Sequence, residues 1–518
     1  MTQVVNTQIA RTARSIGSPA GASTYGQIFW STVLIGGSSV ANVVFRVVRT
    51  KAMALILGPA GFGLLGIYGS IADVAQSLAG MGIQNSGVRQ IAEAVGSGDQ
   101  ERVARTAAVL KLVAVALGAL GALGLALVAG PVSQLTFGTR DGVAGVTLLS
   151  LAVLFREIAV GQGALIQGMR RIADLARLTV LSAFLETAIT IPIVYIWGTG
   201  GVVPSLVSVA AVSILVFSWY GRKVGMPRVA VSLGAVGREA GALVSLGFAF
   251  MVTGFLTMGA GYVIRILVLR TVGFEAAGLY QAAWALGGLY VAFILQAMGA
   301  DFYPRLTAVA EDHQACNRMV NEQAHISLLL AGPGVLATLT LAPLVIALFY
   351  SPKFYPAVTI LRWVCVGMTL RVIAWPMGYI VVAKGAKGIM VATEVAATVV
   401  HVGLAWTLLP VVGLTGTGIA FCGLYVWHTL LIYSVVRRLT GFRLSSENRR
   451  VVLIFLPLMG ATFSACYVLP NWLAVTLGLG LSAATGLYSL QRLLLLVSPD
   501  STPRALRSWL LRLGFSAA

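Results

Sequence analysis

Long apolar stretches separated by short polar connections fill almost the whole chain. About 20 consecutive apolar residues, folded as a helix, cross the ~30 Å hydrocarbon core of a bilayer. Fourteen stretches meet this requirement and are predicted to be transmembrane helices. They cover residues 27–57, 62–88, 104–130, 143–168, 173–197, 201–221, 239–270, 276–303, 324–350, 356–383, 387–410, 414–436, 451–469 and 472–496. The pattern therefore predicts an all-α polytopic membrane protein.

The composition supports this fold class. Of the 518 residues, 58% are hydrophobic and 10% are charged, and the mean hydropathy is +0.89. Soluble domains carry roughly 25% charged residues. Residues 1–26 are polar and lack the apolar core of a cleavable signal, so we expect a cytoplasmic tail. At the other end, residues 498–518 are predicted to form an amphipathic cytoplasmic helix, lying at the membrane interface or docked on the protein itself.

The basic residues alternate between loops. Most of the 36 lysines and arginines lie near the two ends or in every second loop, whereas the opposite set of loops holds Arg140, Arg270 and Lys353. Positively charged loops stay in the cytoplasm, which predicts that both termini are cytoplasmic. The net charge of +19 follows this topological pattern, so it is no indication of nucleic-acid binding.

An internal repeat joins the two halves of the chain. The segment from Gly58 to Leu64 recurs from Gly273 to Leu279, 215 residues later, and the pair Arg156 and Ile158 recurs as Arg371 and Ile373 at the same offset. Six spans per copy give both copies the same orientation. We expect two six-helix lobes, related by a pseudo-two-fold axis along the membrane normal, with the substrate between them.

This repeat sets the expected boundaries. Residues 27–225 form the N-lobe with spans 1 to 6, and residues 226–440 form the C-lobe with spans 7 to 12. Residues 441–497 add spans 13 and 14 outside the repeat. We expect a monomer.

Several cations lie inside the predicted spans. Asn42, Arg46 and Arg49 fall on one stripe of the first span, and Lys51 follows them. A cation at mid-membrane costs about 2.5–3.5 kcal/mol on insertion scales, so such residues usually face a cavity or a partner. Arg49 and Arg156 have repeat equivalents in Arg265 and Arg371. The seven candidates for a cationic substrate cavity are Asn42, Arg46, Arg49, Lys51, Arg156, Arg265 and Arg371.

Intramembrane carboxylates offer an alternative reading of these arginines. They are candidates for ion-pair partners or for ion-coupling groups, and they are Asp73, Glu157, Glu186, Asp301 and Glu394. Glu157 adjoins Arg156 but projects ~100° away on a helix, so it is not an automatic partner. Lys51 alternatively extends toward the nearer interface. The cysteines and histidines have no metal-ligand spacing, and no cofactor or metal is expected.

Several turn and helix-end motifs resemble one known family. The segments from Leu57 to Leu64 and from Leu78 to Asn85 are similar to those of the Wzx-type polysaccharide flippases, which belong to the multidrug/oligosaccharidyl-lipid/polysaccharide exporter superfamily. The segments from Val132 to Gly138, Tyr350 to Phe354 and Gly378 to Lys384 resemble its enterobacterial common antigen branch. Spans 13 and 14 instead resemble the peptidoglycan-precursor flippases of the superfamily.

The resemblance implies a transporter of the bacterial inner membrane and not an enzyme. Its substrate would be an undecaprenyl-pyrophosphate-linked oligosaccharide, such as an O-antigen repeat unit of lipopolysaccharide, and its partners would be membrane lipids and the polysaccharide polymerase or chain-length machinery. Two alternatives stay open, a multidrug/cation antiporter and a peptidoglycan-precursor flippase. A membrane enzyme would need positioned acids, bases or metal ligands at an exposed face, and the short outer loops supply none.

Overall fold

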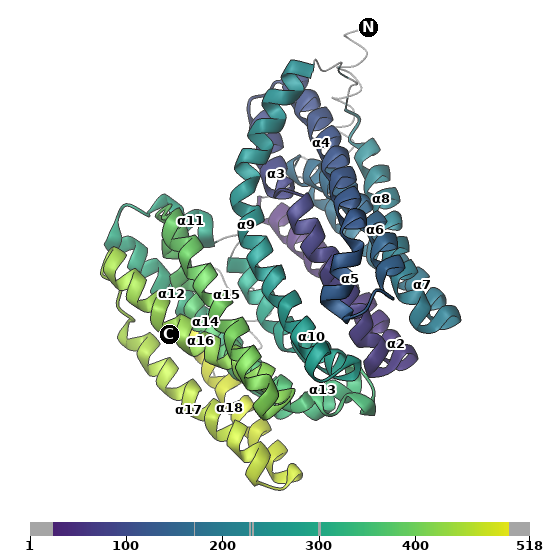
Figure 1. Ribbon diagram of the computed structural model, residues 1–518. Coiled ribbons are helices and arrows are strands. Elements are labelled where there is room, and N and C mark those ends of the chain that lie inside the picture. The colour runs from purple at the N-terminus through teal and green to yellow at the C-terminus, as the bar shows by residue number, and fades with distance from the viewer. Residues whose placement is uncertain (1–23, 170, 227–228, 230–232, 299–301, 497–518) are drawn as a thin grey trace.

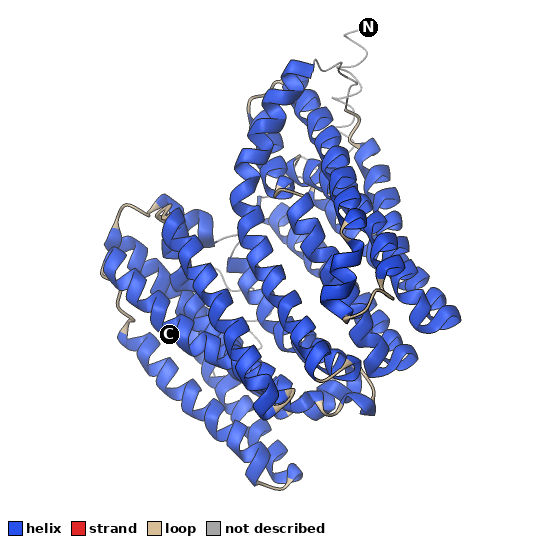
Figure 2. Cartoon of the chain, viewed as in Figure 1, coloured by secondary structure: helices blue, strands red, loops and turns tan. Residues whose placement is uncertain are grey.

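The computed structural model describes residues 24–169, 171–226, 229, 233–298 and 302–496. All described secondary structure is helical, and the helices are joined by short loops (Figure 2). Eleven stretches of the described chain are long and apolar enough to cross a membrane, and two of these each contain a pair of helices joined by a tight turn. The protein is therefore an all-helical polytopic membrane protein.

The first half of the chain gathers on one side of the molecule (Figure 1). Its elements are α2 (Thr24–Ala79), α3 (Ile83–Gly96), α4 (Gln100–Leu127), α5 (Ala129–Phe137), α6 (Val143–Gly168), α7 (Ile172–Trp197), η1 (Gly198–Gly201) and α8 (Val202–Lys223).

The second half begins with two helices that lie between the first half and the remaining helices (Figure 1). They are α9 (Leu233–Thr271) and α10 (Phe274–Ala297). The elements that follow are α11 (Tyr303–Ala308), α12 (His313–Thr340), α13 (Ala342–Phe349), η3 (Pro352–Phe354), α14 (Ala357–Ala383), α15 (Lys387–Val412), α16 (Thr415–Thr440), α17 (Ser446–Val468) and α18 (Asn471–Leu496).

In both copies of the repeat, the chain reverses direction at a glycine with a similar backbone conformation. Gly58 has φ 61° and ψ −174°, and Gly273 has φ 107° and ψ −178°. This region of φ/ψ space is essentially restricted to glycine. The turn at Gly58 divides α2 into two spans, and the turn at Gly273 joins α9 to α10. The repeat read from the sequence thus corresponds to a repeated local structure.

The two halves meet where α2 crosses α10, and the contact there is reciprocal. A Cβ atom added at Gly63 would collide with the Phe274 carbonyl oxygen, and one added at Gly278 would collide with the Pro59 carbonyl oxygen. Pro59 and Phe274 are themselves equivalent in the repeat, as are Gly63 and Gly278. Such a mutual contact is what a two-fold relation generates.

Two of the predicted spans are each divided into two helices in the structure. The predicted span 62–88 is broken at Gly80, because Met81 and Gly82 take positive φ values of 46° and 68° and α3 begins afresh at Ile83. The predicted span 324–350 divides into α12 and α13. α12 begins at His313, where the Asp312 side chain accepts hydrogen bonds from the backbone N–H groups of Gln314 and Ala315. Those bonds lower the pKa of Asp312.

α17 and α18 pack against α12, outside the repeat. A buried amide network fixes the start of α17. The Asn448 side chain donates to the backbone and side-chain oxygens of Asn321 at 2.8 and 3.0 Å, and its Oδ1 lies 3.0 Å from His325 Nδ1. The predicted tail, residues 498–518, lies outside the described residues.

Candidate functional site

The cationic stripe of the first span ends in an ion pair. Arg49 on α2 donates from Nη1 to Glu186 Oε2 on α7 at 2.6 Å, with both side chains about a quarter exposed. Arg46, one turn earlier, is exposed, and Asn42 is half-buried. Neither has a hydrogen bond or ion pair among the described residues. The stripe therefore carries one neutralised arginine and one free cation.

Lys51 reaches across to the second half of the chain. Its Nζ donates to the Ala347 carbonyl at 2.7 Å and also to the Tyr350 carbonyl, both at the end of α13. The last carbonyls of a helix lack partners within the helix, and a cation there is favoured by the helix dipole. Lys51 thus joins α2 of the first half to the end of α13 in the second half.

Arg156 on α6 is also paired with an acid. Its Nη1 donates to Asp73 Oδ1 at 2.8 Å, and Gln76 Oε1 lies 3.5 Å away. Glu157, the next residue, points elsewhere, as the helix geometry predicts. Its side chain is 2% exposed and lies against Gly80, where an added Cβ would be 2.8 Å from Oε1. Glu157 Oε2 has no hydrogen-bond partner among the described residues.

Asp73, Gln76 and Glu157 line one cavity, which we call the polar pocket. It has a volume of about 410 Å³ and lies among α2, the start of α3, α6 and α9. α9 contributes Met251, Gly254 and Met258 to the lining. Two carboxylates and one neighbouring guanidinium give this pocket an acidic balance.

Arg265 and Arg371 differ from their repeat equivalents because no described carboxylate lies within 4 Å of either. Arg265 on α9 donates from Nε to Gln281 Oε1 at 2.9 Å and lies 5.8 Å from the Tyr280 ring. On α14, the guanidinium carbon of Arg371 lies 4.5 Å from the centre of the Trp375 ring. The buried Nε of Arg371 has no hydrogen-bond partner among the described residues.

A small cavity of about 140 Å³ lies next to Arg371. It is lined by Trp375, Glu394 and His428, among others, from α14, α15 and α16. Glu394 acts on Arg371 electrostatically without forming a hydrogen-bonded pair. Asp301, the remaining predicted carboxylate, lies outside the described residues.

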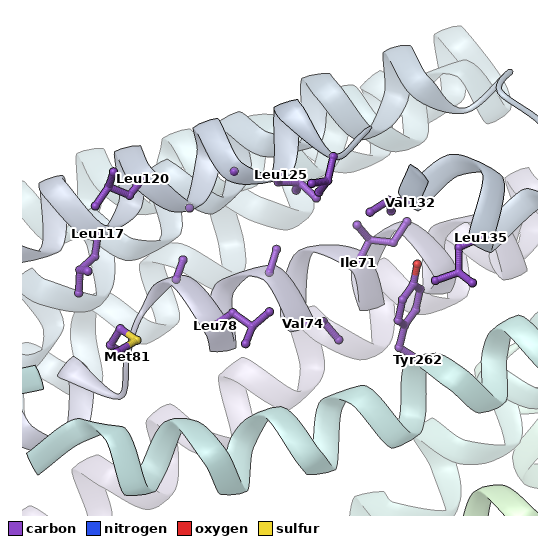
Figure 3. A pocket seen from close by; sticks show the side chains of 15 residues that line it. Ile71, Val74, Leu78, Met81, Leu117, Leu120, Leu125, Val132, Leu135 and Tyr262 are labelled. Carbon is purple, nitrogen blue, oxygen red and sulfur yellow. The ribbon is translucent and has the colours of Figure 1, made fainter. Parts of the chain in front are cut away.

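An apolar groove lies beside the polar pocket on the other side of α2. It has a volume of about 550 Å³ and runs between α2, α4, α5 and α9 (Figure 3). Leu78 and Leu120 point into it from α2 and α4, and the Tyr262 ring closes one end (Figure 3). The Tyr262 hydroxyl lies 2.5 Å from Thr136 Oγ1 on α5.

Gln76 and Gln281 are site residues that the sequence analysis did not name. Gln76 is found by helical spacing, since it lies three residues after Asp73 and shares its face. Gln281 is separated from Arg265 by the turn at Gly273, so only the fold of the α9–α10 hairpin brings them together.

The comparison with known proteins identifies the family. Residues 52–359 match the family described as "Polysaccharide biosynthesis protein". The chain belongs to this family. It is 25% identical to the lipid III flippase of Escherichia coli K12 over 400 residues, which cover 74% of this chain and 92% of that protein, and the match to the lipid III flippase of Shigella flexneri has the same extent.

Solved structures show the same fold at low identity. The lipid II flippase MurJ in an inward closed conformation has a TM-score of 0.64 and 12% identity, and it covers 90% of this chain and 98% of its own. An inward-facing MATE transporter of the MOP superfamily has a TM-score of 0.62 and 15% identity, with 77% and 94% covered.

The resemblance seen in the sequence is therefore confirmed. The chain is a Wzx-like flippase of the multidrug/oligosaccharidyl-lipid/polysaccharide exporter superfamily, a multi-pass bacterial membrane transporter and not an enzyme.

Proposed function

We propose that this flippase moves an undecaprenyl-pyrophosphate-linked oligosaccharide from the cytoplasmic to the periplasmic leaflet of the bacterial inner membrane. The glycan would be a repeat unit of O-antigen or of a related surface polysaccharide. Support comes from the family match and from the lipid III flippases, whose length this chain covers almost completely.

The proposed mechanism is alternating access between two lobes, 27–225 and 226–440, each built from six spans. With the two spans of 441–497, this arrangement has fourteen spans and both termini in the cytoplasm. The observation that carries it is the reciprocal contact of Gly63 and Gly278, because equivalent residues of the two copies meet each other there. A pseudo-two-fold axis through this contact would relate the two lobes, which then move relative to each other during transport.

The four repeat-related arginines fall into two groups, according to whether they form an ion pair. Arg49 and Arg156 are neutralised by acids and hold helices of the first half together. Arg265 and Arg371 form no ion pair with a described carboxylate, and Arg46 is an exposed cation on α2. We assign the pyrophosphate to Arg265 and Arg371, with Arg46 as an auxiliary contact. A guanidinium gives phosphate oxygens two parallel hydrogen bonds.

The test uses purified protein in vesicles that contain fluorescent undecaprenyl-pyrophosphate oligosaccharide. A membrane-impermeant quencher reports how fast the labelled lipid changes leaflet. We expect transport by the wild type, a loss of at least tenfold in Arg265→Ala, and partial recovery in Arg265→Lys, because the planar fork is lost. Arg438→Ala, which removes an exposed arginine at the end of α16, is the matched control.

The same preparation distinguishes the two alternatives. Mass spectrometry of the lipid that copurifies with the protein identifies its head group. A peptidoglycan precursor would reassign the substrate class. Absence of leaflet exchange together with proton- or sodium-driven export of cationic dyes would overturn the proposal in favour of an antiporter.

A further inference from the structure

The polar pocket beside Glu157 is lined by helices of both halves, lies about two helical turns from Arg265 along α9, and has acidic side chains in its lining. We propose that this pocket binds the first sugar of the lipid-linked glycan, whose hydroxyl groups donate hydrogen bonds to the Glu157 carboxylate. The inference rests on the proposed function and assigns a part of the substrate to a separate site.

The lining of the pocket disfavours the pyrophosphate. Its described residues include no lysine or arginine, and the neighbouring Arg156 guanidinium is already bonded to Asp73, with Glu157 as a second acidic side chain. A pyrophosphate would bring two more negative charges into a partly desolvated space, where like charges repel strongly. A neutral group rich in hydroxyls meets no such penalty.

Glu157 itself requires a hydrogen-bond donor. A buried polar atom without a partner costs about 1–3 kcal/mol, and a charged one costs more. Glu157 belongs to the lining of the pocket, and its buried Oε2 has no hydrogen-bond partner among the described residues. A sugar hydroxyl supplies the missing donor, and the amides of Gln76 and Asn85 in the same lining offer further donors and acceptors.

The size of the pocket fits a sugar better than an ion. Sites for organic ligands typically measure about 300–1,000 Å³, and the polar pocket measures about 410 Å³. A metal site would draw several acidic, histidine or cysteine ligands around one point. The described residues contain no such cluster of three or more.

The spacing along two helices connects the pocket to Arg265. On α9, Met251, Gly254 and Met258 line the pocket, and Arg265 follows on the same face seven residues later, ~10 Å along the axis. On α2, Gly66 lies against the Gln281 side chain that holds Arg265, and Asp73 begins the pocket seven residues further on. Both helices therefore place the cation and the pocket ~10 Å apart, which accommodates a pyrophosphate followed by its first sugar.

The experiment compares undecaprenyl pyrophosphate with undecaprenyl-pyrophosphoryl-N-acetylglucosamine, which share the polyprenyl pyrophosphate and differ in whether its terminal phosphate is esterified to a sugar. Binding of each to purified wild type and to Glu157→Gln is measured in the same nanodiscs. We expect Glu157→Gln to weaken binding of the sugar-bearing lipid about tenfold and to leave the sugar-free lipid unchanged. Arg265→Ala should weaken both lipids equally.

Gly80→Ala provides a second variant, since its methyl group would press on the Glu157 carboxylate and should give the same selective loss. Glu322→Gln, at an exposed position of α12, is the control. An equal loss for both lipids in Glu157→Gln, or sodium-dependent binding abolished by it, would overturn the sugar assignment. Failure of the wild type to bind either lipid would instead overturn the proposed function.

Discussion

The Lys51 contact predicts how firmly the lobes close on the side of the α2–α10 crossing. Lys51 belongs to the first half and donates to two carbonyls at the end of α13 in the second half. Alternating access requires the lobes to part on this side. Lys51→Met keeps most of the aliphatic side chain, removes the ammonium group, and should therefore favour the open arrangement.

The magnitude follows from the two hydrogen bonds. A bond to a charged group contributes about 1.5–3 kcal/mol when buried. Lys51 is half-buried, so the pair together is worth about 2 kcal/mol. Because ~1.4 kcal/mol corresponds to a factor of ten, the ratio of closed to open molecules should fall about 30-fold.

Spin labels report this ratio directly. Arg140→Cys and Lys353→Cys place labels at exposed positions after α5 and next to α13, in a background without the four native cysteines. In Lys51→Met, we expect a larger fraction of molecules with the longer distance between the two labels, which corresponds to the open arrangement. Lys387→Met, which removes an exposed lysine at the start of α15, should leave the distance distribution unchanged. Identical distance distributions in Lys51→Met and the parent would refute the idea that the Lys51 hydrogen bonds stabilise the closed arrangement.

Two further predictions concern the contacts that hold the helices together. Gly278→Ala should abolish transport, because the added methyl group would collide with the Pro59 carbonyl, whereas Gly259→Ala, with open space around it, should retain transport. Full transport by Gly278→Ala at a normal protein level would contradict the close contact of α2 and α10 at this position. Arg49→Ala should lower the amount of folded protein by leaving Glu186 unpaired, and the double variant with Glu186→Gln should recover it, as measured by size-exclusion chromatography. Normal levels of Arg49→Ala alone would show that the pair contributes no stability.

Hydrophobic pattern alone was enough to predict the helical class and the positions of most spans. The repeat was also visible in the sequence, because Gly58 and Gly273 occupy a conformation that other residues rarely adopt. The break between α2 and α3 was missed, since Met81 takes a positive φ that its residue type does not signal.

Asp73 and Glu186 were among the candidate partners named from the sequence, but which arginine each would pair with could not be predicted, because the pairing depends on helix packing. Glu186 lies 137 residues from Arg49, and Asp73 lies 83 residues before Arg156. Helical geometry indicated that Glu157 is not an automatic partner of Arg156, and among the described residues Arg156 pairs with Asp73. The assignment of any arginine to substrate stays a prediction, but the contrast between paired and unpaired arginines favours Arg265, Arg371 and Arg46 over Arg49 and Arg156.

That contrast also predicts how the membrane potential drives the cycle. The ion pairs of Arg49 and Arg156 carry no net charge, so the charge of the empty proposed site comes from Arg265 and Arg371 and is at most about +2, because Glu394 acts on Arg371. A bound pyrophosphate of about −2 cancels this charge, and the loaded step becomes nearly electroneutral. The potential then acts on the return of the empty cationic site toward the negative cytoplasm, with ~2.3 kcal/mol per charge per 100 mV for a full crossing and proportionally less for a partial one.

In sealed vesicles, collapse of the potential with valinomycin and potassium should slow multiple-turnover flipping several-fold while the first turnover stays unchanged. Arg371→Gln should reduce this dependence, because one moving charge is removed. A first turnover as sensitive to the potential as later ones would show that the loaded carrier moves the charge, and would refute this assignment of the cations.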